Sequence, residues 1–290
     1  MLTIGSSFSG LSLDEILSNI DYYADTLEKR KVIGFRGIDL SIDEHHVLIN
    51  ALAFRRWDNT SRGKGKESVS GHGETFSVYT KNNDKSRGVE GYIIPARSHH
   101  QIEKEFIVGD EEEFFKWSVH IDTPQNPDKP SDILQSYTSM HMHLFKYPES
   151  VGRTKFLSLV DLYKKCPANY KEKLLHKKVR EYKNNGTLHL GTWDALIKHP
   201  VTDEKMLFWP SWYVGLDDGD EPWFDELVEW TRGYMSNKDN WFFWSWKEND
   251  FVMFDNRALV HSFEGGWVSE NRVFSQGGIG SGKLIPLEAI

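Results

Sequence analysis

A histidine followed by an arginine eleven residues later is the first feature from which chemistry can be inferred. His261 follows the apolar run 251–254, and a run of this kind after a polar turn is typical of a strand buried on both faces. Arg272 lies in a second strand-like run beyond Gly265-Gly266, so we expect the two runs to pair as a hairpin. Such a pair would combine a metal-ligating imidazole with a guanidinium that binds an anion.

A single histidine does not make a metal site, so partners must be sought upstream. A non-haem Fe(II) site takes two histidines and one carboxylate on one face of the metal. Residues two apart on a strand point to the same side, and both His120-Ile121-Asp122 and His141-Met142-His143 have this spacing. The second pair lies in the alternating run 137–145, which is typical of a half-exposed strand. We therefore prefer His120 and Asp122, while a site built on His141 and His143 stays open.

Three motifs in a fixed order give the chain a family resemblance. They are His120-Ile121-Asp122, the segment 151–158 with Thr154, and the segment 255–261 followed by Arg272. In this order the chain resembles the TauD/TfdA (taurine dioxygenase-like) group of Fe(II)/2-oxoglutarate-dependent oxygenases over most of its length. Three positions depart from the family pattern: Val151 replaces a glycine, Arg153 an acidic residue and Phe254 a tryptophan.

The resemblance implies a mainly β protein with flanking helices and a double-stranded β-helix, or jelly-roll, core. It also implies that His120, Asp122 and His261 hold Fe(II). The cosubstrate 2-oxoglutarate would bind the metal and pair with Arg272 and Thr154, and O2 would take the remaining position. The expected activity is hydroxylation or desaturation of a small polar metabolite, such as an amino acid derivative, while 2-oxoglutarate is decarboxylated to succinate.

The substrate itself is less defined. In taurine-type members a second arginine follows the first by four residues, and Gln276 stands at that position here. We therefore expect a substrate other than a small sulfonate. Two alternatives of different class stay open: a non-catalytic jelly-roll binding protein, and an oxygenase that modifies nucleotides or nucleic acid through the basic loop Arg62 to Lys66. The net charge of -8 makes a nucleic acid partner unexpected.

The elements that position these residues begin with two helices. Capping-box patterns at Ser12 and Ser41 predict one helix over residues 12–29 and another from residue 42. A strand is expected between them, and His45 is expected on the surface of the second helix. Residues 58–90 are typical of a long loop or lid, in which His72 is expected to be exposed. A further helix is expected from Pro167 to about Glu181.

Chain length and composition indicate the domain organisation and the cellular setting. We expect the 290 residues to form a single oxygenase domain. Residues 1–115 would supply flanking helices, a strand and the lid loop, and residues 116–280 the metal-binding core with a helical insert at about 158–235. The only cysteine, Cys166, excludes an internal disulfide, and neither a signal peptide nor a membrane span is apparent. We expect a cytoplasmic protein with a small-molecule substrate and no membrane partner; a homo-oligomer stays open.

Overall fold

The computed structural model of the chain describes residues 4–54, 82–84, 89–91, 93–99, 118–122, 137–183, 188–219, 221–264, 272–279 and 285–287. The basic loop from Arg62 to Lys66 and the loop histidine His72 lie outside these described residues. Within them, no helix has the length and apolar character needed to cross a membrane.

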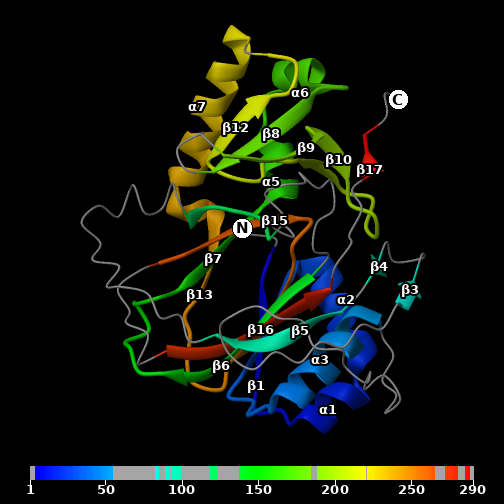
Figure 1. Ribbon diagram of the computed structural model, residues 1–290, viewed down its shortest axis with the longest axis vertical. Helices are drawn as coiled ribbons and strands as arrows, with labels where there is room; N and C mark the ends of the chain where they lie inside the picture. The colour runs from blue at the N-terminus through cyan, green and yellow to red at the C-terminus, as the bar shows by residue number, and fades with distance from the viewer. Residues whose placement is uncertain are drawn as a thin grey trace.

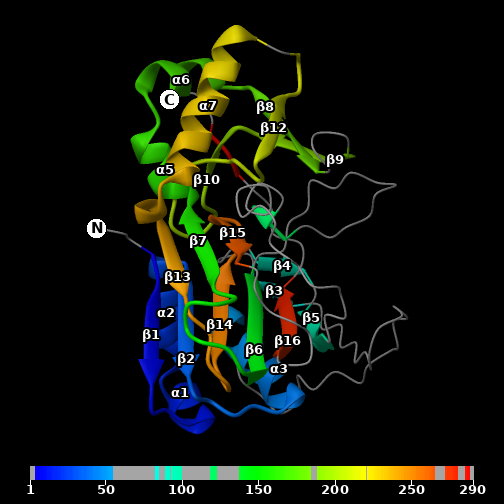
Figure 2. The ribbon, with the colours of Figure 1, turned by 90° about the vertical axis from the view of Figure 1, so that its left-hand side faces the viewer.

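The largest sheet combines strands from both ends of the chain (Figures 1 and 2). In spatial order its strands are β1 (Ser6–Ser9), β2 (Val32–Arg36), β14 (Phe251–Asp255), β6 (Tyr137–Phe145), β16 (Arg272–Ile279) and β5 (Ile93–His99). β1 and β2 run parallel, and the other neighbours are antiparallel. Because β14 pairs with both β2 and β6, the apolar run that leads to His261 lies inside the sheet.

Strand β14 is buried along its whole length, as its apolar sequence predicts. Val252 and Phe254 pack into the core on one face of the sheet, while Phe251 and Met253 pack into the core on the other. This alternation follows from the period of two along a strand. The strand therefore contributes side chains to two separate apolar cores, one on each face of the sheet.

A second, smaller sheet packs against the first. It consists of β13 (Trp241–Trp244), β7 (Thr154–Ser158) and β15 (Leu259–Phe263). The core between the sheets contains Phe156 and Trp244 from the smaller sheet and Met142 and Phe254 from the larger one. Two sheets facing each other over one apolar core form a sandwich of the jelly-roll kind, so the expectation of a mainly β protein with a jelly-roll core is confirmed.

Three helices cover the other face of the large sheet (Figure 1): α1 (Leu13–Ser18), α2 (Ile20–Arg30) and α3 (Ile42–Phe54). Both predicted capping boxes are present. The Ser12 hydroxyl accepts from the Glu15 amide at 3.3 Å while the Glu15 carboxylate accepts from the Ser12 amide at 2.8 Å, and Ser41 forms the same pair of bonds with Glu44. The single helix predicted over 12–29 is interrupted at Asn19.

The expected surface position of His45 is wrong. Its side chain is fully buried between α3 and the large sheet, where its Nδ1 lies 2.8 Å from the Ser275 hydroxyl and its Nε2 lies 2.9 Å from the Ser139 hydroxyl. A buried imidazole is tolerated when both nitrogens have partners. The face of β6 that carries Ser139 and His141 is likewise buried rather than half-exposed, because α3 covers it.

The expected hairpin between the His261 strand and the Arg272 strand is also wrong. β15 pairs with β7 in the small sheet, whereas β16 pairs with β6 and β5 in the large one. The chain therefore crosses from one sheet to the other between these strands. The local sequence between the two strands favours a turn. However, the strands with which β15 and β16 pair are distant in sequence, and these pairings determine the sheet to which each belongs.

The segment between β7 and β13 forms a separate group of elements, shown above the sandwich in Figure 2. Its helices are α5 (Leu159–Lys165), α6 (Ala168–Leu174), α7 (Pro222–Ser236) and the short 3-10 helix η3 (Lys238–Asn240). Its strands are β8 (Lys178–Lys183), β9 (Leu188–Asp194), β10 (Leu196–Lys198), β11 (Lys205–Leu207) and β12 (Tyr213–Leu216). The helix predicted from Pro167 to about Glu181 ends at Leu174, because the chain enters β8 four residues later.

Three short strands complete the described part of the chain. β3 (Asn82–Asp84) pairs with β4 (Val89–Gly91), and β17 (Ile285–Pro286) pairs with β10. The pairing of β17 with β10 brings the C-terminal region of the chain against the group of elements that follows β7.

Stability should depend on pH through His141. Burial, with a smaller effect of the neighbouring His143, lowers the pKa of His141 to about 4. In the unfolded chain the pKa of this histidine is about 6.5, so the unfolded state binds the proton more strongly than the folded state. A change from pH 7 to pH 5 therefore lowers the free energy of unfolding by about 2 kcal/mol through this residue. In urea titrations at both pH values, His141→Gln should lose less stability than the wild type by about this amount. Equal losses would contradict a buried neutral imidazole.

Candidate metal centre

His120 is held against β15 by its own main chain. Its amide donates to the carbonyl of His261 at 2.9 Å, and the His261 amide donates back to the His120 carbonyl at 2.9 Å. In an antiparallel pair, residues that exchange both bonds lie directly opposite and project to the same side. The two imidazoles consequently lie together, with ring centroids 4.2 Å apart.

Asp122 is positioned by Asn256, which follows the last residue of β14. The Asn256 side chain accepts from the Asp122 amide at 2.9 Å and donates to the Asp122 carbonyl at 2.8 Å. From β6, the Thr138 hydroxyl donates to the Asp122 carboxylate at 2.8 Å. Asn256 and Thr138 were not identified as site residues from the sequence, although Asn256 belongs to the motif between Asp255 and Arg257.

The turn that carries Asn256 is fixed by a buried charged network. Arg257 donates to both carboxylate oxygens of Asp255, at 2.9 and 2.7 Å. The same carboxylate accepts from Nε2 of His199 at 2.8 Å, while Nδ1 of His199 accepts from two main-chain amides. His199 is therefore neutral, in agreement with burial lowering its pKa to about 4. His199 is not among the clustered ligands.

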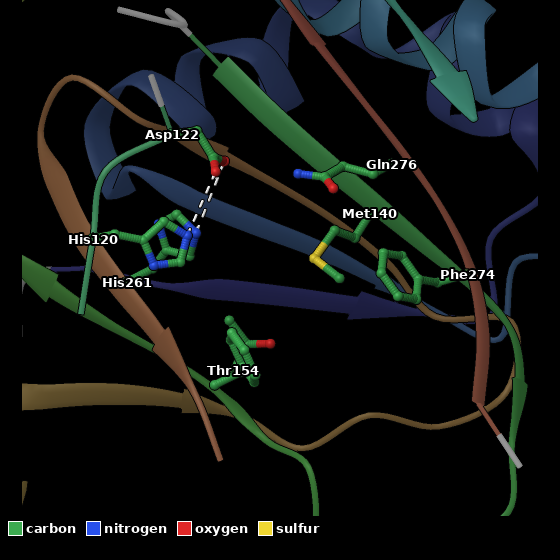
Figure 3. A pocket seen from close by; sticks show the side chains of 8 residues that line it. His120, Asp122, Met140, Thr154, His261, Phe274 and Gln276 are labelled. Atoms are coloured by element: carbon green, nitrogen blue, oxygen red, sulfur yellow. Dashed lines mark ion pairs between the residues drawn. The ribbon is translucent and has the colours of Figure 1, made fainter. Parts of the chain in front are cut away.

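The three predicted ligands converge on one point (Figure 3). Nε2 of His120 lies 3.6 Å from one carboxylate oxygen of Asp122, and Nε2 of His261 lies 3.8 Å from the other. Two atoms bonded to one ion at about 2.1 Å each lie at most about 4.2 Å apart, so both pairs are within reach of a single cation. Among the described residues this is the one group of three or more histidine, cysteine and carboxylate side chains whose ligand atoms all lie within 4.8 Å of one another.

One hydrogen bond sets the tautomer of His120, and the neighbours of Asp122 keep its carboxylate ionised. Nδ1 of His120 lies 2.7 Å from the Ser118 carbonyl, so Nδ1 carries the proton and the lone pair of Nε2 faces Asp122. Burial raises the pKa of Asp122, but His261 and the Thr138 hydroxyl, among other neighbours, outweigh burial and hold that pKa well below its usual range. A metal ion replaces any proton at Nε2 of the imidazoles, and two neutral imidazoles with an ionised carboxylate suit a divalent cation such as Fe(II).

A cavity of about 150 Å³ opens beside these ligands. Cavities of about this size admit a molecule as large as benzene. The Thr154 hydroxyl faces this space and accepts from the indole of Trp246 at 2.9 Å, so its own proton is left to donate. The lining consists of His120, Asp122, Met140, Thr154, His261, Phe263, Phe274 and Gln276.

Arg272, the predicted partner of 2-oxoglutarate, is the first residue of β16. Its main chain is opposite Phe145 of β6, and its side chain lies outside the described part of the structure. The same strand brings Phe274 and Gln276 into the cavity lining. The structure therefore places Arg272 on the strand that forms one wall of the cavity.

His141 and His143 lie apart from this cluster. Nε2 of His141 lies 2.8 Å from the Ile38 carbonyl, and Nε2 of His143 lies 3.0 Å from the Ser275 hydroxyl. Along β6 these residues alternate with Thr138 and Met140, which point to the metal side. The alternative site based on these two histidines thus lies on the opposite face of the sheet from the three converging ligands.

A β sandwich that presents two imidazoles and one carboxylate around one point has the features of a non-haem Fe(II) oxygenase. Residues 2–275 match the taurine catabolism dioxygenase TauD, TfdA family, and the chain belongs to that family. It is an Fe(II)/2-oxoglutarate-dependent oxygenase that uses Fe(II), 2-oxoglutarate and O2. Among curated proteins, none matches the chain.

Solved structures share this fold at low sequence identity. A protein of Burkholderia xenovorans assigned as an alpha-ketoglutarate-dependent taurine dioxygenase is 17% identical with a TM-score of 0.66, over 98% of this chain and 88% of that one. A taurine dioxygenase of the same organism is 16% identical with a TM-score of 0.65, over 99% and 92%. AAD-2, in complex with Mn(II) and N-oxalylglycine, is 15% identical with a TM-score of 0.63, over 100% and 97%.

Asn256→Ala should weaken metal binding although Asn256 is not a ligand. The change removes both hydrogen bonds that hold the main chain of Asp122, and loss of such outer contacts costs about 10- to 100-fold in metal affinity. Calorimetric titration of the apo-protein with Mn(II) would measure the effect. Unchanged affinity would show that Asp122 is positioned by other contacts.

His143→Ala should leave Mn(II) affinity within about twofold of the wild type, because His143 lies on the far face of β6. Asp122→Ala should abolish binding in the same titration, since it removes the only anionic ligand of the cluster. Loss of binding in His143→Ala, with retention in Asp122→Ala, would instead support the alternative histidine site.

Proposed function

We propose that His120, Asp122 and His261 hold the Fe(II) of this oxygenase, and that Arg272 and Thr154 hold 2-oxoglutarate. The observation that carries the proposal is the convergence of the three ligand side chains at the edge of a cavity that Thr154 also lines. The ligands come from two distant parts of the chain, the segment 118–122 and strand β15.

The charges of these residues suit both the metal and the cosubstrate. Two neutral imidazoles and one carboxylate leave a single net positive charge on a bound divalent ion, which favours an anionic cosubstrate. A guanidinium binds a carboxylate through two parallel hydrogen bonds, and a threonine hydroxyl can add a third donor. The hydroxyl of Thr154 is oriented for that role because its oxygen already accepts from Trp246.

When bound, Fe(II), 2-oxoglutarate and O2 supply the oxidation: 2-oxoglutarate loses CO2 to become succinate, and the substrate C–H bond is oxidised. The chain itself positions the reactants. Met140, Phe263 and Phe274 provide apolar surface that limits water beside the metal ligands. Asp122 stays ionised and keeps its carboxylate available to the metal, because its pKa is lowered.

For the substrate we propose a small polar metabolite such as an amino acid derivative, hydroxylated or desaturated at a carbon near the metal. Gln276 and Met140 lie opposite each other on β16 and β6, and both line the cavity. An uncharged amide beside a thioether favours a neutral polar group with adjoining apolar atoms over an anion. The uncharged side chain of Gln276 thus argues against taurine, because a sulfonate favours a cationic partner.

Succinate formation would test this proposal. With Fe(II), 2-oxoglutarate and O2, the wild type should release succinate slowly, and a true substrate should increase the rate of succinate release. In Asp122→Ala the substrate-stimulated rate should be at least about 100-fold lower. Taurine should not accelerate it. Acceleration by taurine would refute the substrate class, and full activity of Asp122→Ala would refute the metal site.

A further inference from the structure

Strands β6 and β16 present different chemistry on their two faces. On one face Thr138, Met140 and Gln276 point to the metal ligands and the cavity. On the other face Ser139 and Ser275 point to helix α3. Each serine is adjacent in sequence to a residue that lines the cavity. A contact that holds the serines therefore also fixes the positions of these lining residues along the two strands.

His45 of α3 holds both serines. Its Nδ1 lies 2.8 Å from the Ser275 hydroxyl on β16, and its Nε2 lies 2.9 Å from the Ser139 hydroxyl on β6. His45 is fully buried and its ring packs edge-on against Phe251, with centroids 5.3 Å apart. One imidazole therefore bridges two neighbouring strands from behind the cavity.

The direction of each hydrogen bond follows from one contact. The Ser139 hydroxyl donates to the Gly277 carbonyl at 3.1 Å, so it must accept from Nε2 of His45. Nδ1 of His45 then lacks a proton and accepts from Ser275, which in turn accepts from Nε2 of His143 at 3.0 Å. Each serine thus receives one bond and gives one, and this arrangement matches a single alignment of the strands.

The pairing of β16 is irregular along both neighbouring strands, which gives such a device a role in its alignment. Its pairing with β6 shifts between Val273 and Phe274, and its pairing with β5 shifts between Gln276 and Gly278. A slip of one residue would turn Ser275 toward the cavity and Gln276 toward α3. The segment that lines the cavity, Phe274 to Gln276, lies between the two irregularities.

We propose that His45 is a positioning residue that locks the register of β16 against β6 and thereby aligns Arg272 and the cavity wall for 2-oxoglutarate. The inference rests on the proposed role of Arg272, which begins the same strand three residues before Ser275. His45 touches neither the metal ligands nor the cavity. Its effect should therefore be selective for the cosubstrate.

The test compares cosubstrate and metal affinity in the same variants. Calorimetry would measure binding of Mn(II) to apo-protein, and then of 2-oxoglutarate to the Mn(II)-loaded protein. His45→Leu, which lacks both bonds, should weaken 2-oxoglutarate binding about tenfold or more while Mn(II) affinity stays within about twofold. His45→Gln should restore most of the cosubstrate affinity, because its amide offers one donor and one acceptor.

Two further variants separate positioning from general destabilisation. Leu52→Ala removes a fully buried side chain of the same helix and should lower the unfolding temperature with 2-oxoglutarate affinity unchanged. Ser275→Ala removes one hydroxyl on β16 and should weaken 2-oxoglutarate severalfold, even if His45→Leu does not fold.

Several results would overturn the inference. Wild-type 2-oxoglutarate affinity in Ser275→Ala and His45→Leu would show that the bonds do not set the alignment. Equal weakening in Leu52→Ala would show that only stability matters, and equal loss of Mn(II) affinity would make the effect unselective. If wild-type protein binds Mn(II) but no 2-oxoglutarate, the proposed cosubstrate site fails and this inference fails with it.

Discussion

The two main-chain hydrogen bonds between His120 and His261 are the constraint on which the site depends. They join the segment 118–122, which forms no named strand, to β15 of the small sheet. Direct opposition puts both imidazoles on one side, and the i, i+2 spacing brings the carboxylate of Asp122 to the same point. The backbone therefore brings the side chains of the candidate metal centre together before any ion binds, as preorganised sites require.

The second requirement is a rigid turn between β14 and β15. Asp255, Arg257 and His199 are fully buried there, and removing one member of a buried ion pair typically costs about 3–5 kcal/mol. The network holds Asn256, and Asn256 holds the main chain of Asp122. A buried charged network outside the cavity lining thus helps to set the position of a proposed metal ligand.

The sequence predicts local structural features better than it predicts pairing between distant segments. The capping boxes at Ser12 and Ser41 and the doubly buried strand β14 were predictable, because each depends on neighbouring residues. The convergence of His120, Asp122 and His261 required the family resemblance as well as spacing. The burial of His45 was not predictable, since its partners lie 94 and 230 residues away. The incorrect prediction of a hairpin has the same cause, because β15 and β16 each pair with a strand that is distant in sequence.

The most direct test of the account is an anaerobic titration of the apo-protein with Fe(II) and then 2-oxoglutarate, followed by visible absorption. Chelation of the metal by the cosubstrate gives a weak charge-transfer band. The band should appear in the wild type, disappear in Asp122→Ala, and require a much higher 2-oxoglutarate concentration in Arg272→Ala. Iron binding without the band in the wild type would contradict the proposed cosubstrate site, and a full band in Asp122→Ala would contradict the proposed ligands.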